Sequence, residues 1–451
     1  MKRPVASRTG AGAVRLGPLM ALALILSGCM DAGNGVVGMF RMSDDARPDT
    51  VTSEPQGELA AAGNQAETRS AIIDQLSERR SIITDGPYAQ VAQAVLSASA
   101  GAAQAELRVA SLTAEAKSKN WLPSVGPSVD LSSLGSVAAS ILVEQVLFDN
   151  GYKKAERAFA AADVEVAAVN LSMDINRRIQ DGLIHYITAQ RAQEQARLAE
   201  TAIARMGEYE RIVAGRIEGG LSDRSEQNVI IQKTSEMQAA LTADRNAASL
   251  AMAELNAMAS HPLDGIAGLQ LLPADPGGPE PLSVLKARGE GARNVAEAQM
   301  ERAAHLPGLK AAGSIGRGGL TGGLRLGADR LLGLGTGAQL EALDAAGEVA
   351  DRREAEERQD AARRLVALQK EIDALRIREA ETKNVLEQTR GSLSLFTEQY
   401  KVGRRPLMEL VGMYETLSGQ EREHASLKYE IAIRQVRMAA ERGVLVDGAR
   451  L

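Results

Sequence analysis

The sequence has little of what most enzymes and nucleic-acid-binding proteins use. Aromatic residues make up 3% of the 451 residues, and there are one tryptophan, one cysteine and four histidines. So few aromatic side chains argue against a dense core or a platform on which bases stack. The net charge of −6, with charged residues of both signs, gives no indication of a nucleic-acid partner. A single cysteine excludes a disulfide within one chain.

Motifs for catalysis and metal binding are missing as well. The four histidines lie far apart and form no ligand-spaced pair, and there is no Gly-x-Ser-x-Gly elbow and no Walker loop. The glycine-rich run 313–319 could be taken for a phosphate cradle. It lacks a βαβ setting, however, and glycines at a strand turn explain it better. We therefore expect no enzyme, no cofactor and no metal site.

Residues 1–28 have the pattern of a signal peptide. Basic residues precede a short apolar run, 19–26, which is too short to span a bilayer. The run ends in Leu26-Ser27-Gly28-Cys29, which resembles the lipobox of bacterial lipoproteins and implies acylation of Cys29. The alternative is a plain secretory signal with an incidental cysteine. By the same resemblance, Met30 favours delivery to the outer membrane. Residues 29–66 are rich in Gly, Asp, Ser and Pro, which predicts a flexible tether.

Three landmarks recur at one spacing and predict a duplicated unit. Leu122-Pro123 is matched by Leu306-Pro307, Asn150-Gly151 by Leu334-Gly335, and the glycine at 219 by the glycine at 403. The offsets 307−123, 335−151 and 403−219 all equal 184. We expect a first repeat over 67–266, a Pro- and Gly-rich linker over 267–281, and a second repeat over 282–447.

Each half is expected to run helix, strand, strand, long helix, tight break, long helix. In the first half, the patterns predict helices over 67–83 and 88–119, strands over 125–131 and 137–148 joined by a turn at 134–136, and helices over 152–216 and 223–259. In the second half, they predict a helix over 282–304, a glycine-rich hairpin over 306–337, and helices over 338–400 and 407–443. The helix over 152–216 would be ~100 Å long, which is too long for a compact domain.

Apolar residues in the long helices follow steps of three and four, which is typical of a coiled-coil seam. The first seam runs from Tyr152 to Met173 and the second from Leu365 to Tyr400. The strands, apolar on at least one face, suit the wall of a membrane barrel. Both hairpins look short, and the arginines of the second (Arg317, Arg325 and Arg330) would have to face a lumen or an interface.

This doubled order resembles the TolC-like outer-membrane efflux proteins over about 88–445. The resemblance implies a mainly α fold with a small membrane β-barrel and long coiled-coil hairpins that form a trimeric α-barrel tunnel. Each subunit of the homotrimer would give four strands to one twelve-stranded barrel. Four strands cannot close a barrel alone, and open edges are not tolerated in lipid.

The function implied is that of a passive channel of a tripartite efflux pump that exports small molecules. The partners would be a periplasmic adaptor protein, an inner-membrane transporter and outer-membrane lipid. The protein would be lipid-anchored in the outer membrane and extend into the periplasm. One alternative is the outer-membrane component of type I protein secretion. Another, from a different class, is a lipid-anchored coiled-coil periplasmic scaffold without a channel.

The resemblance also places periplasmic tips, where an adaptor docks and the tunnel closes, at Gly219 and Gly220 and at Gly403. Tyr400 and Arg405 match residues whose hydrogen bonds and salt bridges hold the aperture shut in the family. Glu409 matches an acid that faces the pore.

The first-half counterpart of this acid is less clear from the sequence, since Asp223 and Glu226 flank the expected position and Ser225 occupies it. Gly412 replaces a second expected acid. The alternative is that Arg405 and Glu409 are solvated charges of a turn and a helix start, where an acid is favourable in any case.

Overall fold

The computed structural model describes residues 70–99, 101–131, 137–273, 277–316, 319–330 and 333–450, all of which belong to one compact unit. The predicted signal peptide, the tether with Cys29, the turn at 134–136 and Arg317 lie outside the described residues. Among the helices that are described, none is both long and apolar enough to cross a membrane.

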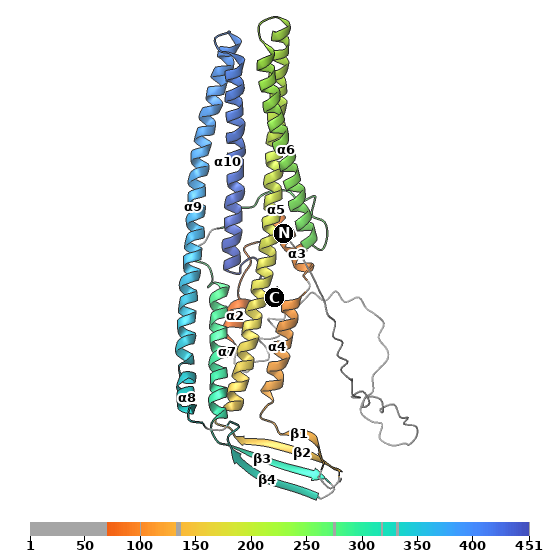
Figure 1. The fold of residues 1–451 in the computed structure, drawn as a ribbon, viewed down its shortest axis with the longest axis vertical. Helices are drawn as coiled ribbons and strands as arrows, with labels where there is room; N and C mark the ends of the chain where they lie inside the picture. Colours follow the sequence, from red (N-terminus) through yellow and green to blue (C-terminus); the bar gives the residue numbers. More distant parts are fainter. Residues whose placement is uncertain are drawn as a thin grey trace, which may run out of the picture. The chain divides into compact units, whose positions relative to one another are not determined.

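The described chain is mainly helical with one small antiparallel sheet, which confirms the predicted balance of elements (Figure 1). The first half contains α2 (Ala71–Ser77), α3 (Gly86–Ser97), α4 (Ala102–Ser118), β1 (Ser124–Leu131), β2 (Val137–Phe148), α5 (Tyr152–Glu218) and α6 (Arg224–Met258). The second contains α7 (Leu282–Ala304), β3 (Gly308–Gly316), β4 (Gly319–Gly327), α8 (Thr336–Asp344), α9 (Ala346–Lys401), α10 (Leu407–Glu441) and the 3₁₀ turn η1 (Gly448–Arg450).

Three of the predicted helices are shorter or divided in the structure. The helix expected over 67–83 is the seven-residue α2, which starts where the Ser70 side chain accepts a hydrogen bond from the backbone N–H of Ile73. The helix expected over 88–119 is two helices, α3 and α4, because Gly101 takes a left-handed conformation with φ of 66° before α4 begins. In the second half, Ala345 separates α8 from α9 by a single residue within the helix predicted over 338–400.

The spacing between the halves changes along the chain. β1 and β3 start 184 residues apart (308−124), and so do α5 and α8 (336−152). In contrast, α6 and α10 start 183 residues apart (407−224), and each is 35 residues long. One residue is therefore missing from the second half before its last helix. These spacings are what a duplication would leave, and the duplication stays a prediction.

Helix α5 is the centre of the packing. It contacts α2, α3, α4, α6, α7 and α10, so it buries a wider face than the predicted heptad seam. Val166 and Val169 of that seam are buried, and so are Ile179 and Leu183 outside it. The seam prediction was too narrow because a helix in contact with six others has little free surface. Each such aliphatic side chain contributes about 1.5–3 kcal/mol through burial.

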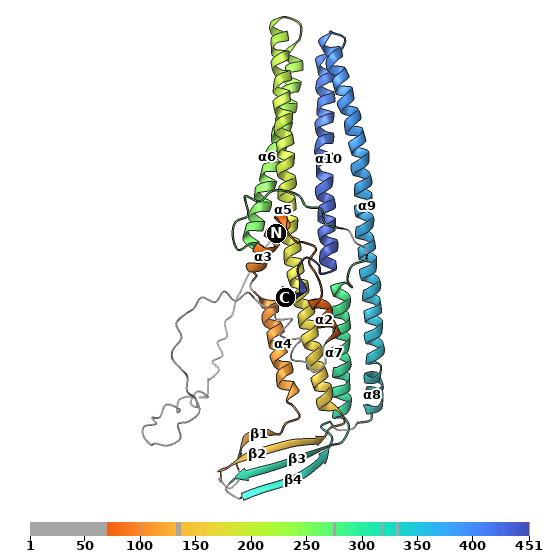
Figure 2. The same ribbon diagram turned by 180° about the vertical axis from the view of Figure 1, so that it is seen from behind.

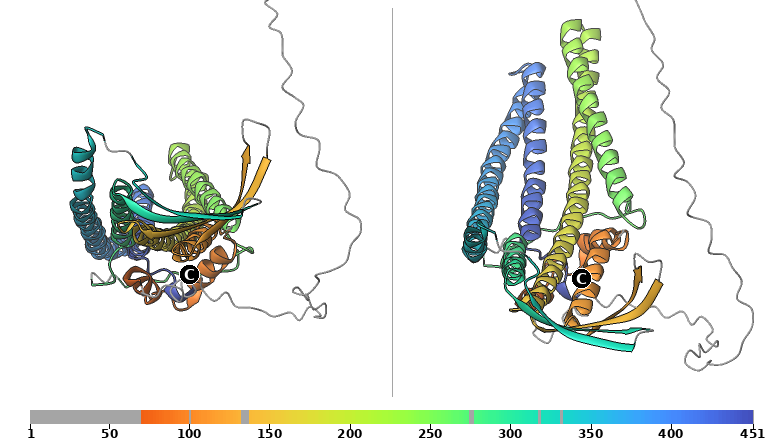
Figure 3. Two further views of the ribbon diagram at one scale, coloured as in Figure 1. Left: turned by 90° about the horizontal axis from the view of Figure 1, so that it is seen from below. Right: turned by 60° about the horizontal axis from the view of Figure 1, so that its bottom comes forward.

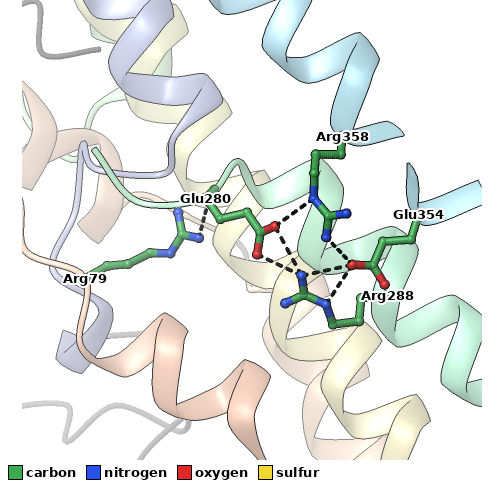
Figure 4. A network of polar contacts seen from close by, with 5 residues as sticks. All are labelled: Arg79, Glu280, Arg288, Glu354 and Arg358. Atoms are coloured by element: carbon green, nitrogen blue, oxygen red, sulfur yellow. Dashed lines mark hydrogen bonds and ion pairs between the residues drawn. The ribbon is translucent and has the colours of Figure 1, made fainter. Parts of the chain in front are cut away.

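Charged as well as apolar side chains join α9 to the rest of the chain. Of the 56 residues of α9, all of them described, three are buried: Ala361, Ile372 and Leu386. Figure 4 shows the charged contacts with α7: Nη2 of Arg288 lies 3.0 Å from a Glu354 oxygen and 3.0 Å from a Glu280 oxygen. Arg358 of α9 pairs with the same two carboxylates.

Arg79, which follows α2, connects this network to the end of α10. Its guanidinium donates to the backbone carbonyl of Glu280 at 2.6 Å (Figure 4). It also donates to the backbone carbonyl of Arg442, so three distant segments meet at one side chain. Burial lowers the pKa of Arg79 to about 10, and the nearby Glu280 charge opposes this shift. The guanidinium therefore stays charged at neutral pH.

The four strands form one antiparallel sheet in the order β1-β2-β3-β4, beyond the ends of the helices (Figure 3). The glycine-rich run contributes Gly313 and Gly316 to β3 and Gly319 to β4, which confirms the strand interpretation over the cradle. Because paired residues point to the same side, the register separates the side chains into two faces. Only the outer edges of β1 and β4 have no partner strand among the described residues.

One face of the sheet is apolar and the other polar. Ile141 lies opposite both Pro127 and Ile315, and Ile315 lies opposite Leu320. The remaining members of this face are apolar or Gly except for Gln145; they are Val125, Val129, Ala139, Val143, Leu309, Ala311, Gly313, Gly322, Leu324 and Leu326. Their larger side chains are mostly exposed, for example Leu324 at 71%.

The other face carries Ser124, Ser128, Ser140, Glu144, Lys310, Ser314, Thr321 and Arg325 among small residues, Leu142 and Val146. Arg325 lies opposite Lys310 on this polar face. A bulge lies between Val146 and Phe148 of β2. It adds one residue, Leu147, and brings Phe148 opposite Leu309, on the apolar face.

Candidate functional site at the two helical tips

The two pairs of long helices turn at the same end of the described unit, away from the sheet (Figures 1 and 2). The first tip is the turn between α5 and α6, and the second is the turn between α9 and α10. Every predicted tip residue lies in one of these turns or in the helix ends beside it, but in a single chain the two tips are separate hairpin ends.

The same backbone motif closes both tips. In the first, the N–H of Gly220 donates to the carbonyl of Ile217 at 3.0 Å, and the N–H of Leu221 donates to that of Arg216 at 2.8 Å. In the second, Gly403 donates to Tyr400 and Arg404 to Gln399, both at 2.9 Å. This is the Schellman arrangement, in which a left-handed residue ends a helix.

The left-handed residues are Gly220 and Gly403, each with φ of 72°, whereas Gly219 has φ of −80°. The predicted equivalence of Gly219 and Gly403 was therefore wrong by one residue. Gly220 is the counterpart of Gly403, and their offset is 183, as it is for the helices that follow.

This correction identifies a pair of acids that the sequence comparison left ambiguous. Counted from the helix starts, Glu226 is the third residue of α6 and Glu409 is the third residue of α10. Glu226, and not Ser225, is thus the counterpart of Glu409. Counting from the start of each helix would have found it, whereas counting from the first glycine did not. Both carboxylates lie where the helix dipole favours negative charge.

Side-chain caps hold the first tip. The carboxylate of Asp223 accepts from the N–H of Ser225 at 2.8 Å and from the N–H of Glu226 at 3.2 Å. The Ser225 hydroxyl, followed by these two N–H groups, lowers the pKa of Asp223 below its ordinary value. The Ser222 hydroxyl donates to Glu226. Asp223 is therefore an N-cap of α6.

Arg405 is the centre of the second tip. Its Nε donates to Oε1 of Gln399 at 2.5 Å, its Nη1 pairs with Glu409, and its guanidinium carbon lies 3.8 Å from the centre of the Phe396 ring. The side chain is 35% exposed. Arg405 is therefore more than a solvated turn charge, and it links α9 to α10. Glu409, at 48%, is more open to solvent.

Tyr400 is half-buried and packs against the apolar cluster beneath the tips. Within the described residues its hydroxyl forms no hydrogen bond, either to Arg405 or to another group. The tip residues predicted to act together are therefore only partly joined in one chain: Arg405 and Glu409 pair, and Tyr400 stands apart.

An apolar cluster just below the tips joins the two hairpins. It includes Met206 and Tyr209 of α5, Ile230 of α6, and Val411 and Tyr414 of α10. The rings of Tyr209 and Tyr414 meet edge to face with centres 5.9 Å apart. Burial raises the pKa of both hydroxyls. The two tips are therefore mechanically connected through α5 and α10.

Ionic contacts continue this connection along α10. Arg422 donates to Asp244 of α6 at 2.6 Å and to the backbone carbonyl of Gln195 at 2.9 Å. Lys428 and Tyr429 hold Glu194 of α5. Burial by itself would raise the pKa of Glu194, but these two hydrogen bonds lower it below its ordinary value.

The described part of the chain has no cluster of three or more His, Cys, Asp or Glu side chains that could bind a metal, at the tips or elsewhere. A cavity of about 620 Å³ lies by the linker and the end of α10, with Arg79, Arg80 and Met438 in its lining. None of the predicted tip residues lines it. Of the histidines, His305 is buried and bonded to the Glu301 carbonyl, and His185 pairs with Glu254.

The chain has the fold of the TolC-like outer-membrane efflux channels. A membrane protein from Pseudomonas aeruginosa superimposes with a TM-score of 0.69 at 15% identity, over 82% of this chain and 92% of that one. The outer membrane protein VceC of Vibrio cholerae gives 0.66 at 14% identity, over 83% and 96%. The open state of the MtrE outer membrane channel of Neisseria gonorrhoeae gives 0.61 at 15% identity, over 83% and 89%. No protein-family model matches the sequence, and no curated protein matches it.

Proposed function

We propose that this protein is a passive, trimeric outer-membrane channel of a tripartite efflux pump. Small molecules would leave the cell through it, driven by an inner-membrane transporter and delivered by a periplasmic adaptor. The observation that carries the proposal is the fold, which outer-membrane channels share over more than four-fifths of the chain. The two faces of the sheet give this likeness a physical reason.

The exposed apolar face of the sheet suits lipid, and the polar face suits a water-filled lumen. The strands have 8, 12, 9 and 9 residues, close to the 9–11 residues that a tilted strand needs to cross a bilayer. In hydrocarbon, each unsatisfied backbone group on the outer edges of β1 and β4 would cost several kcal/mol. Pairing β4 of one subunit with β1 of the next would satisfy both edges, and three copies would close a twelve-stranded barrel.

An exposed apolar stripe on α9 also supports the homotrimer. Val366, Ile377 and Leu395 are 61%, 60% and 65% exposed. Their spacings of 11 and 18 residues correspond to whole helical turns, so they share one face. The buried Ile372 lies on the other side of the helix. A neighbouring subunit would cover this stripe in a tunnel of side-by-side helices.

In this arrangement, the sheet lies in the outer membrane and the tips lie in the periplasm, where the adaptor docks. We assign residues 1–28 as a cleaved signal peptide and Cys29 as the lipidated residue, and each half of the body as one repeat. The tip formed by Gly219, Gly220 and Asp223 and the tip formed by Tyr400, Gly403, Arg405 and Glu409 would close the tunnel at rest. No catalytic step and no cofactor are involved.

Single-channel conductance in planar lipid bilayers tests the proposal. The wild type should insert and conduct weakly, because its tips are closed. Arg405→Glu should raise conductance, since it would repel Glu409 and lose the contact with Phe396. Arg404→Glu is the matched control: Arg404 is the exposed neighbour, and its side chain contacts no charged or polar partner among the described residues. Equal conductance in both variants would contradict a role of the Arg405 tip in closing the channel. A wild type that never inserts would favour the lipid-anchored scaffold instead.

The only tryptophan gives an independent test of membrane insertion. Trp121 is 61% exposed and lies just before β1, at the junction of helices and sheet. Tryptophan favours the level of the lipid headgroups. Its fluorescence should therefore be quenched by phospholipids brominated near the headgroup, and less by those brominated at the end of the acyl chain. No quenching by either would contradict a sheet placed in the bilayer.

A further inference from the structure

The two tips share a backbone turn but not the chemistry that closes it. At the first tip, the Asp223 side chain caps α6. At the second tip, the residue in that position is Pro406, and α10 has no side-chain cap. The side-chain polar contacts that link the end of α9 to the start of α10 at this turn come from Arg405. The residues that hold the Arg405 side chain in place therefore also stabilise the turn between α9 and α10.

Arg405 is seated by two residues of α9. Its guanidinium lies over the face of the Phe396 ring, 3.8 Å from the ring centre, which is within the range of a cation–π interaction. The side-chain oxygen of Gln399, also on α9, accepts a hydrogen bond from Nε of Arg405. The remaining end of the guanidinium reaches Glu409 at the start of α10. The ring and the amide thus aim the guanidinium at Glu409.

We propose that Phe396 is a positioning residue of the second tip: its ring holds Arg405 on its own hairpin and so keeps the tip closed. The inference rests on the proposed channel function. Without the ring, the Arg405 side chain regains its rotamers, and its pairing with Glu409 becomes one pose among several. The tip then loosens toward the open state. By the range typical of cation–π pairs, loss of the ring should change the closed-to-open ratio roughly two- to thirtyfold.

The bland role for Phe396 is apolar packing, because its ring is partly buried against the cluster below the tips. The experiment separates the two roles by comparing variants in single-channel recordings. Phe396→Leu, which keeps an apolar side chain without a π face, should raise the open fraction. Phe396→Trp, with a stronger π face, should keep the wild-type value. Ser394→Ala, at an exposed position of α9 outside the apolar stripe, is the control for a change in α9 that does not touch Arg405.

A double-variant cycle gives the decisive readout. In a background of Arg405→Gln, Phe396→Leu should have no further effect on the open fraction, because the residue it positions is already neutral. A full additional effect in that background would overturn the proposal and assign Phe396 to packing. If Phe396→Leu does not assemble, Phe396→Met, which is closer in volume, takes its place in the same cycle.

The failure of this inference is distinguishable from the failure of the proposed function. If Arg405→Glu opens the channel and both Phe396→Leu and Phe396→Met leave it closed, the channel stands and the positioning role is refuted. If neither the wild type nor any variant conducts, the channel itself is refuted, and the positioning role falls with it.

Discussion

The contact between Arg422 and Asp244 should be the strongest single ionic tie between the two hairpins. Arg422 of α10 reaches Asp244 of α6 at 2.6 Å, and the two side chains are 25% and 13% exposed. Breaking a fully buried pair costs about 3–5 kcal/mol, because one charge is left buried. An exposed pair contributes about 0–1 kcal/mol. A pair buried to this extent lies between these limits.

We therefore expect Arg422→Met to lower the free energy of unfolding by about 2 kcal/mol. Methionine keeps the apolar stem of the arginine and leaves Asp244 without its cation. Asp244→Asn keeps an oxygen that accepts from Arg422, and it should cost about 1 kcal/mol. The double variant should cost less than the sum, with a coupling of about 1 kcal/mol.

The measurement is denaturant unfolding followed by far-UV circular dichroism, on the detergent-extracted protein. Arg376→Met is the matched control, because Arg376 is an exposed arginine of α9 without an ionic partner among the described residues. It should lie within about 0.5 kcal/mol of the wild type. Additive effects of the two substitutions at the tie would refute the reasoning, and so would an Arg422→Met variant as stable as the control.

Two further predictions test the corrected tip and the contact made by Glu194. Gly220→Ala should lower the free energy of unfolding by about 1 kcal/mol, because alanine is strained at positive φ, whereas Gly219→Ala should not destabilise; the reverse order would restore the original alignment. The pKa of Glu194 is lowered, chiefly by Lys428 and Tyr429 against the effect of burial, so the stability it contributes is present above its ordinary pKa of 4.5 and is lost as pH falls through the lower, folded value. Glu194→Gln should therefore flatten the fall of stability with acid below about pH 4.5, and an unchanged slope would contradict the contact.

The sequence was sufficient for features that depend on local chemistry. The break after α5 and the break before α10 are visible as glycines, and the long helices are visible from their apolar period. The apolar alternation of Val125 and Val129 likewise indicated a strand. These signals are carried by residues a few positions apart, so they survive without knowledge of the tertiary structure.

Features set by hydrogen-bond register or by packing were beyond the sequence. Gly219 and Gly220 are equally able to take positive φ. Which of the two takes it depends on which backbone N–H groups donate to the last carbonyls of α5. The apolar period of the helix does not predict these donors to within one residue. The extra residue at Leu147 broke the two-residue alternation of β2 for a similar reason. Because the alignment at the tip was wrong by one residue, it paired Ser225 with Glu409 in place of Glu226.

The narrow seam predicted for α5 failed for another reason. A heptad pattern describes contact with one or two neighbours, whereas α5 contacts six helices and buries small residues on several sides. Alanine gives no periodic signal in such a helix because it is equally acceptable on an exposed and on a buried face. The close packing of α5 therefore required the structure.

The central claim is that three copies close one barrel through the edges of β1 and β4. The most direct measurement is the mass of the detergent-extracted mature protein by light scattering, corrected for bound detergent. We expect three times the mass of one chain. A monomer that leaves the membrane once its lipid is removed would contradict it, because the unpaired strand edges would then never have been in the bilayer.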